Sequence, residues 1–263
     1  MLSHNESLCL WTEWSDWRGC NSLLISVTDG RVQIYTGHTN NCQQKERFET
    51  RICQDRTLDI RFDPTTLYST CFLSVDHKIL SNRYTDRTPY NPRAGSRFQN
   101  YRGAMVNTWV EKSTSIYYEI YFQYLITSTL SWGDLVLELG IGEHNKIDNH
   151  YYGGNINVSG WTFYLSNCIG YDRVCLKAQH QLIFEFIKPF SSNTAGTRVN
   201  GTFGMLIDRE RNKFSLIYNN TDLFTFHDVL SNVSLCPVFG VYMPLFGEVS
   251  MQIVSVGNIT LMF

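Results

Sequence analysis

Residues 201–220 read GTFGMLIDRERNKFSLIYNN, and this stretch decides the fold class. An apolar run and an alternating run flank the charged residues 208–213. Two runs of strand-forming residues on either side of a short polar stretch predict a β-hairpin with an exposed turn. In the second run Phe214 and Leu216 share one face while Ser215 lies on the other, as expected for a strand with one wet face.

The same pattern of strand-forming runs and polar turns continues on both sides of this hairpin. From residue 57 to the end, short alternating or apolar runs recur every 8 to 15 residues or so and are separated by turn-rich pieces such as NPRAGS and YNNTD. Aromatic residues make up 14% of the chain, which fits strands better than helices. The pattern predicts an all-β sandwich of antiparallel strands. Residues 116–126, IYYEIYFQYLI, are so apolar that we expect both faces of this strand to be buried.

Composition limits the partners. The 263 residues carry a formal net charge of −2 and only 17% charged residues, so no basic field favours nucleic acid or an anionic membrane surface. No run of 18 apolar residues occurs, so we expect no membrane span in this chain.

Enzymatic chemistry finds no support in the sequence. The seven histidines form no HExxH motif and no close pairs with cysteines, and GxSxG, GxxxxGK[ST] and GxGxxG are all absent. His144 and His150 share a polar segment and are more easily explained as solvated loop residues than as metal ligands. We therefore expect a protein that is not an enzyme and has no cofactor and no metal.

Several runs together resemble the PRY-SPRY domain. LDIRFDPTTLYSTCFLSVD at 58–76 is similar to its opening, and WTFYLSN, the hairpin at 201–220 and LCPVFGVY follow in the family's order. The resemblance covers about residues 57–256. It implies two antiparallel sheets in a distorted jelly-roll sandwich, here residues 57–263, without catalytic activity and with partner recognition by loops at one end. No zinc-ligand pattern of a RING or B-box module precedes it.

The first 56 residues form a separate predicted module. LWTEWSDWRGC at 10–20 places three tryptophans at intervals of three, and KERFETRIC at 45–53 alternates charged residues as on one face of a strand. Guanidinium groups stack well on tryptophan faces, so we expect a ladder that replaces a core in so small a piece. Its members are Trp11, Trp14, Trp17, Arg47 and Arg51.

This stretch resembles a thrombospondin type 1 repeat over about residues 8–56. The departures are 21 residues between Cys20 and Cys42, Glu49 where an arginine is expected, and no evident third strand. The resemblance implies C-mannosylation at Trp11 and Trp14, although we favour a purely structural role for the tryptophans.

Eight cysteines suggest disulfides. Cys9, Cys20, Cys42 and Cys53 would staple the N-terminal module, and Cys168 with Cys175 could close a short loop. Free buried thiols remain the alternative for Cys168, Cys175, Cys71 and Cys236. Acceptor sequences for N-glycosylation occur at Asn5, Asn157, Asn200, Asn219, Asn232 and Asn258.

The cysteines and acceptor sequences favour an extracellular or secreted protein. No apolar stretch near Met1 could serve as the core of a signal peptide, so either the chain is cytosolic or its true N-terminus lies upstream. We favour the second interpretation. The alternative is a cytosolic adaptor or a substrate receptor of the ubiquitin-ligase type.

Binding is expected in exposed loops that combine aromatic and charged residues. Three segments fit, at 82–93, 143–152 and 242–248, and the first is the richest because it offers Tyr84, Arg87 and Tyr90. The resemblance implies that the partner site includes Tyr84, Arg87, Tyr164, Ser166, Tyr242 and Met243. We expect a protein partner, with a glycan as the alternative. For Trp161, Phe163, Phe203 and Phe239 we predict core positions.

Overall fold

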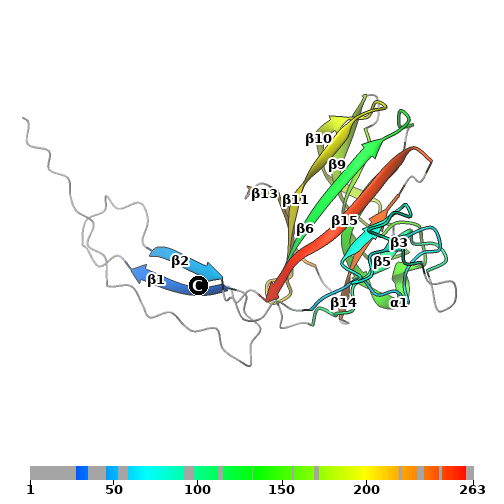
Figure 1. The fold of residues 1–263 in the computed structure, drawn as a ribbon. Helices are drawn as coiled ribbons and strands as arrows, with labels where there is room; N and C mark the ends of the chain where they lie inside the picture. The colour runs from blue at the N-terminus through cyan, green and yellow to red at the C-terminus, as the bar shows by residue number, and fades with distance from the viewer. Residues whose placement is uncertain are drawn as a thin grey trace, which may run out of the picture. The chain divides into compact units, whose positions relative to one another are not determined.

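The computed structural model describes residues 28–34, 46–52, 59–91, 98–111, 115–131, 133–155, 157–168, 172–218, 221–229, 234–242 and 245–258 (Figure 1). The chain divides into two compact units. One draws on Met1–Leu58 and Gly257–Phe263, and the other is Asp59–Val256.

The first unit contains one described sheet. β1 (Thr28–Ile34) pairs antiparallel with β2 (Glu46–Ile52), with Arg47 opposite Gln33 and Arg51 opposite Asp29. The strand predicted around Arg47 and Arg51 is therefore present. Its partner comes from the 21-residue stretch between Cys20 and Cys42 that departs from the repeat pattern. Trp11, Trp14, Trp17 and the cysteines at 9, 20, 42 and 53 lie outside the described residues.

The second unit is a β-sandwich of two antiparallel sheets, as the sequence predicts (Figure 1). The six-stranded sheet has the order β10 (Ile183–Ser192), β9 (Arg173–His180), β8 (Trp161–Asn167), β7 (Leu135–Glu143), β14 (Leu235–Val241) and β5 (Gly103–Met105). The seven-stranded sheet has the order β13 (Thr221–Phe226), β12 (Lys213–Tyr218), β11 (Arg198–Asp208), β6 (Ser115–Ile126), β15 (Gly247–Asn258), β4 (Ile79–Ser81) and β3 (Phe72–Leu73). One short helix, α1 (His144–Ile147), follows β7.

Aromatic rings join the two sheets. Phe163 of β8 lies 4.9 Å from Phe214 of β12, between ring centroids, and Phe239 of β14 lies 6.4 Å from Tyr118 of β6. All four predicted core residues are confirmed as buried: Trp161, Phe163, Phe203 and Phe239. Each such aromatic side chain removes a large apolar area from water, so this layer holds the sheets together.

The hairpin predicted at 201–220 is present as β11 and β12. Phe203 pairs with Tyr218 and Asp208 pairs with Lys213. The turn is less exposed than predicted, because Asp208 and Arg209 are only 2% and 4% exposed. The Asp208 carboxylate accepts hydrogen bonds from the Ser115 hydroxyl and from the Arg211 backbone and side chain, which explains its burial.

The prediction for residues 116–126 is wrong in one respect. In β6 fully buried residues alternate with half-buried or exposed ones, so the strand has one wet face. The buried set includes Ile120 and Phe122, whereas Tyr121 is half-buried and Gln123 is exposed. The sequence of this strand looks apolar because tyrosines occupy its wet face. A tyrosine ring counts as apolar in a sequence pattern, although its hydroxyl can reach water.

The strand β10 forms one edge of the six-stranded sheet and is unusually exposed. Ile183, Phe184 and Ile187 are 64%, 51% and 56% exposed. Its pairing with β9 contains two irregularities, between Phe184 and Phe186 and between Pro189 and Ser191.

Candidate functional site

Two of the three predicted binding segments are fastened together by Asn82, which is 3% exposed. Its amide nitrogen donates to the carbonyl oxygens of Tyr242 (2.6 Å) and Gly247 (3.0 Å), and its amide oxygen accepts from the Val249 backbone N–H (2.9 Å). Next to it the Arg83 guanidinium pairs with the Glu248 carboxylate at 2.5 Å. Segments some 160 residues apart in sequence are therefore held side by side.

A compact turn at residues 83–88 carries Tyr84 and Arg87, two of the predicted binding residues. The Thr88 hydroxyl donates to the Arg83 carbonyl (3.0 Å) and lies 2.7 Å from the Thr85 hydroxyl, and the Thr88 backbone N–H donates to Thr85 (2.9 Å). These bonds hold residues 83–88 while the side chains of Tyr84 and Arg87 stay exposed. Tyr84 is 64% exposed and contacts Phe72 edge-on, with ring centroids 6.1 Å apart.

Tyr90 closes the same segment. Its backbone exchanges two hydrogen bonds with Leu73 of β3 (2.8 and 2.9 Å), and its ring lies 5.0 Å from that of His77. The side chain is 38% exposed. Tyr84, Arg87 and Tyr90 are thus all accessible to a partner.

A hollow of about 480 Å³ lies beside the 242–248 segment. Its exposed lining combines apolar and charged groups, because Leu245 is 81% exposed, Phe246 is 36% exposed, and Arg102 and Asp134 also line it. Tyr151, from the second predicted segment, contributes a ring that is 42% exposed. The third segment and part of the second therefore meet at this hollow.

Beneath the hollow lies a buried carboxylate. Tyr242, which lines the hollow, donates its hydroxyl to the Glu138 carboxylate at 2.6 Å, and the Gly153 backbone N–H donates to the same group at 2.9 Å. Burial raises the pKa of Glu138 to about 6, and these two donors hold it from rising further. Tyr242 is thereby fixed in place and is 2% exposed.

Glu138 makes stability depend on pH. Its pKa is about 6 when folded against 4.5 for the free side chain, so the folded state holds this proton more tightly. The stability contributed by this protonated carboxyl is present in full below pH 4.5 and is lost as the pH rises through 6. The free energy of unfolding falls by about 2 kcal/mol over this range. Urea unfolding at pH 4.5 and pH 7 should show this fall, and Glu138→Gln should remove it. The exposed Glu210→Gln is the control and should keep it; an unchanged pH dependence in Glu138→Gln would contradict the assignment.

Three predicted site residues are buried. Tyr164 is 4% exposed and donates its hydroxyl to the Gln179 side chain at 2.5 Å, and Ser166 is 1% exposed. The segment 151–154 covers this part of the sheet: a Cβ on Gly153 would lie 2.8 Å from the Thr162 methyl, so only glycine permits so close an approach. Tyr242 is the third, and Met243 lies outside the described residues. In this conformation the structure separates these residues from the accessible set of Tyr84, Arg87 and Tyr90.

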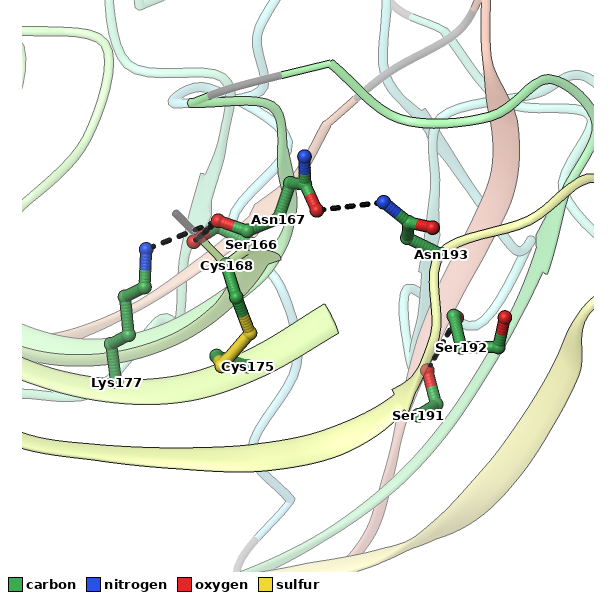
Figure 2. The surroundings of a disulfide bond; sticks show 8 residues. All are labelled: Ser166, Asn167, Cys168, Cys175, Lys177, Ser191, Ser192 and Asn193. Carbon is green, nitrogen blue, oxygen red and sulfur yellow. Dashed lines mark hydrogen bonds between the residues drawn. A yellow bond between two sulfur atoms is a disulfide. The ribbon is translucent and has the colours of Figure 1, made fainter. Parts of the chain in front are cut away.

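The Cys168–Cys175 disulfide is confirmed, with the Cα atoms 5.3 Å apart (Figure 2). Figure 2 shows that the neighbouring residue Asn167 is held from two sides: the Lys177 ammonium donates to the Asn167 carbonyl at 3.2 Å, and the Asn193 amide donates to the Asn167 side chain at 2.8 Å. Cys71 and Cys236 are free buried thiols. The bridge and these bonds fix the end of β8 and the start of β9.

The glycosylation candidates have different positions. Asn157 and Asn200 are exposed, Asn258 ends β15, and Asn5, Asn219 and Asn232 lie outside the described residues. In the part of the chain that the structure describes, no cluster of three or more His, Cys, Asp or Glu side chains could hold a metal ion. Nor does that part contain a helix long and apolar enough to cross a membrane.

Sequence reasoning missed Asn82, Arg102 and Glu138. Asn82 begins the predicted segment 82–93, but no local pattern marks either Asn82 or Arg102 as a functional residue. Glu138 carried a signal, since a lone carboxylate inside the apolar run LVLELGIG is rarely buried without partners.

Comparisons with known proteins give distant similarities. No family model and no curated protein sequence matches the chain. Among solved structures, the PSpry domain of TRIM65 is 17% identical with a TM-score of 0.48, over 75% of this chain and 89% of that one. The SPRY domain of human HERC1 is 17% identical with a TM-score of 0.40, over 76% and 99%. Metal-free lectin I-B4 from Griffonia simplicifolia is 11% identical with a TM-score of 0.44, over 78% and 93%.

Proposed function

We propose that this chain is a non-catalytic recognition protein that binds a protein partner through the surface formed by segments 83–90 and 242–248. The observation that carries the proposal is the pinning of these two segments by Asn82 and by the Arg83–Glu248 pair. A surface held by buried bonds loses little conformational entropy on binding, which favours affinity.

The exposed residues on this surface have the composition of a binding site. Tyr84 and Arg87 offer an aromatic ring and a guanidinium group, and Leu245 and Phe246 are apolar side chains that line the hollow. Tyrosine and arginine supply much of the energy in protein interfaces, and an exposed apolar patch with a polar border is typical of a partner site. We call these four residues the recognition surface.

Photo-crosslinking tests the proposal. We place p-benzoylphenylalanine at position 245, and separately at Glu210 in the β11–β12 turn, and expose each protein to a pool of secreted and cell-surface ectodomains and to a cytosolic extract. One protein should crosslink at 245 and not at 210. Adding Tyr84→Ala with Arg87→Ala should weaken capture at least about 30-fold, because hot-spot side chains contribute 2 kcal/mol or more each.

The same double variant separates binding from folding. Both side chains are exposed, so its free energy of unfolding should change by less than about 0.5 kcal/mol. Equal crosslinking at position 210, or capture that survives the double substitution, would reject the recognition surface.

We further propose an extracellular setting, supported by the Cys168–Cys175 disulfide and the exposed acceptor Asn157. The alternative is a cytosolic adaptor. Non-reducing peptide mapping of the natural protein distinguishes them: a Cys168–Cys175 bridge and a glycan on Asn157 support the first, and eight free thiols with bare asparagines the second.

A further inference from the structure

A second concavity, separate from the hollow, lies on the outer face of the seven-stranded sheet. It has a volume of about 460 Å³, which is in the range of small-ligand sites. Its floor comes from β4, β15, β6 and β11, and the turn at 85–88 forms one side. We call it the groove. Figure 1 shows β11, β6 and β15 running side by side across this sheet.

The floor carries a row of polar side chains beside apolar ones such as Leu125 and Val199. Gln123 of β6 lies opposite Asn200 of β11, and Tyr121 of β6 lies opposite Thr202. On the other side of β6, strand β15 contributes Ser250 and Gln252. Amides and hydroxyls both donate and accept hydrogen bonds, so these side chains can pair with a ligand whose groups also do both.

Along β6 and β15 only side chains are available to a ligand. β6 lies between β11 and β15, and β15 lies between β6 and β4, so the backbone groups of both strands already bond within the sheet. An extended peptide that recognises a sheet through its backbone needs a free edge. The groove has the interior of the sheet as its floor, which disfavours a peptide.

The charge of the groove is positive. Three arginines and two carboxylates line it: Arg83, Arg87, Arg198, Asp86 and Glu248. Arg83 is paired with Glu248. In the described part of the chain, Arg87 and Arg198 have neither an ion pair nor a side-chain hydrogen bond. Two free guanidinium groups next to amides favour a ligand that carries carboxylate or sulfate groups.

We propose that the groove binds an acidic oligosaccharide, whose hydroxyls bond to Gln123, Asn200 and Gln252 and whose acidic groups pair with Arg87 and Arg198. Sugar hydroxyls donate and accept like the amides of the floor, and a ring of Tyr121 offers an apolar face to the sugar ring. The groove shares Arg87 with the recognition surface, but neither Leu245 nor Tyr84 lines it, so Leu245→Asp tests the two sites separately.

Asn200 adds a condition. It begins the acceptor sequence Asn200-Gly201-Thr202, and its side chain lines the groove. A glycan attached there would fill the space that the ligand requires. The site therefore requires an unmodified Asn200 in the natural protein, and a glycosylated Asn200 found by peptide mapping would overturn the proposal without affecting the recognition surface.

The binding test uses the full chain and three hexasaccharides in 0.15 M NaCl: hyaluronan with carboxylates, heparin with sulfates in addition to carboxylates, and neutral maltohexaose. One acidic hexasaccharide should bind at least about tenfold more tightly than the neutral one. Tighter binding of heparin than of hyaluronan would indicate that the added sulfates contribute. Arg87→Ala and Arg198→Ala should each weaken it about tenfold, the effect of one lost charge-assisted hydrogen bond. Gln123→Ala should weaken it by a smaller factor.

A matched control removes an arginine elsewhere. Arg173 is exposed on β9, outside the groove, and Arg173→Ala should leave the affinity unchanged. Leu245→Asp should also leave it unchanged while abolishing capture of the protein partner. Equal weakening by Arg173→Ala, no binding of either acidic hexasaccharide, or equally tight binding of a hexaglutamate peptide would overturn the site. Unchanged melting temperatures establish that the variants are folded.

Discussion

Phe203→Ala is expected to lower the free energy of unfolding by about 3 to 5 kcal/mol, measured by urea denaturation. The Phe203 ring is fully buried and stacks on Phe122 with centroids 4.5 Å apart. Phe190 from the other sheet and Tyr218 from β12 lie 5.9 and 5.3 Å away. Removing the ring leaves a cavity between the sheets, and these neighbours cannot fill it without leaving their own contacts.

Phe184→Ala is the matched control, since it removes the same ring from an exposed position on β10. The Phe184 side chain is 51% exposed, and its ring centroid lies 5.7 Å from the Lys177 ammonium. We expect a loss of at most about 1 kcal/mol. Similar losses for the two variants would mean that Phe203 does not lie in the core.

Asn82→Ala is expected to cost roughly 3 kcal/mol of stability. Alanine would leave the carbonyls of Tyr242 and Gly247 and the N–H of Val249 without their hydrogen-bond partner. Unsatisfied buried polar groups each cost about 1 to 3 kcal/mol, although water entering the site would recover part of this. Urea denaturation measures the loss.

Asn82→Ala should also loosen the proposed binding surface. Because Asn82 fastens segment 83–90 to segment 242–248, hydrogen exchange at residues 245–249 should accelerate in the variant. Asn149→Ala removes one exposed hydrogen bond, to the Asn157 carbonyl at 3.3 Å, and should change neither quantity appreciably. If Asn82→Ala leaves exchange at 245–249 unchanged, Asn82 does not hold the two segments together.

The fold could be predicted because its signals are local. Two strand-forming runs around a polar stretch predict the hairpin at 201–220. Phe203 and Phe239 lie in strand-forming runs of this kind. The error at β6 has a physical cause. Tyr117 and Tyr121 raise the apparent hydrophobicity of a wet face, so the period of two is hidden in the sequence but clear in the structure.

The site was only partly predictable because its geometry depends on distant contacts. Loop composition identified Tyr84, Arg87 and Tyr90, which are accessible. Residues placed by resemblance alone differ from these: Tyr164 lies beside Tyr152 of segment 151–154, with ring centroids 6.2 Å apart, and both Tyr164 and Ser166 are buried. Nothing in their own strand indicates this burial. Asn82 joins two segments whose proximity exists only in the folded chain, so no sequence pattern could have indicated it.

The edge strand β10 bears on how this protein behaves at high concentration. An unprotected edge strand with exposed apolar side chains would associate with other copies of the protein, and β10 exposes Ile183, Phe184 and Ile187. Pro189 has no amide hydrogen to offer, and the two breaks in register interrupt the row of donors that a passing strand would need. The edge can therefore keep apolar side chains in water without acting as a template for fibre growth.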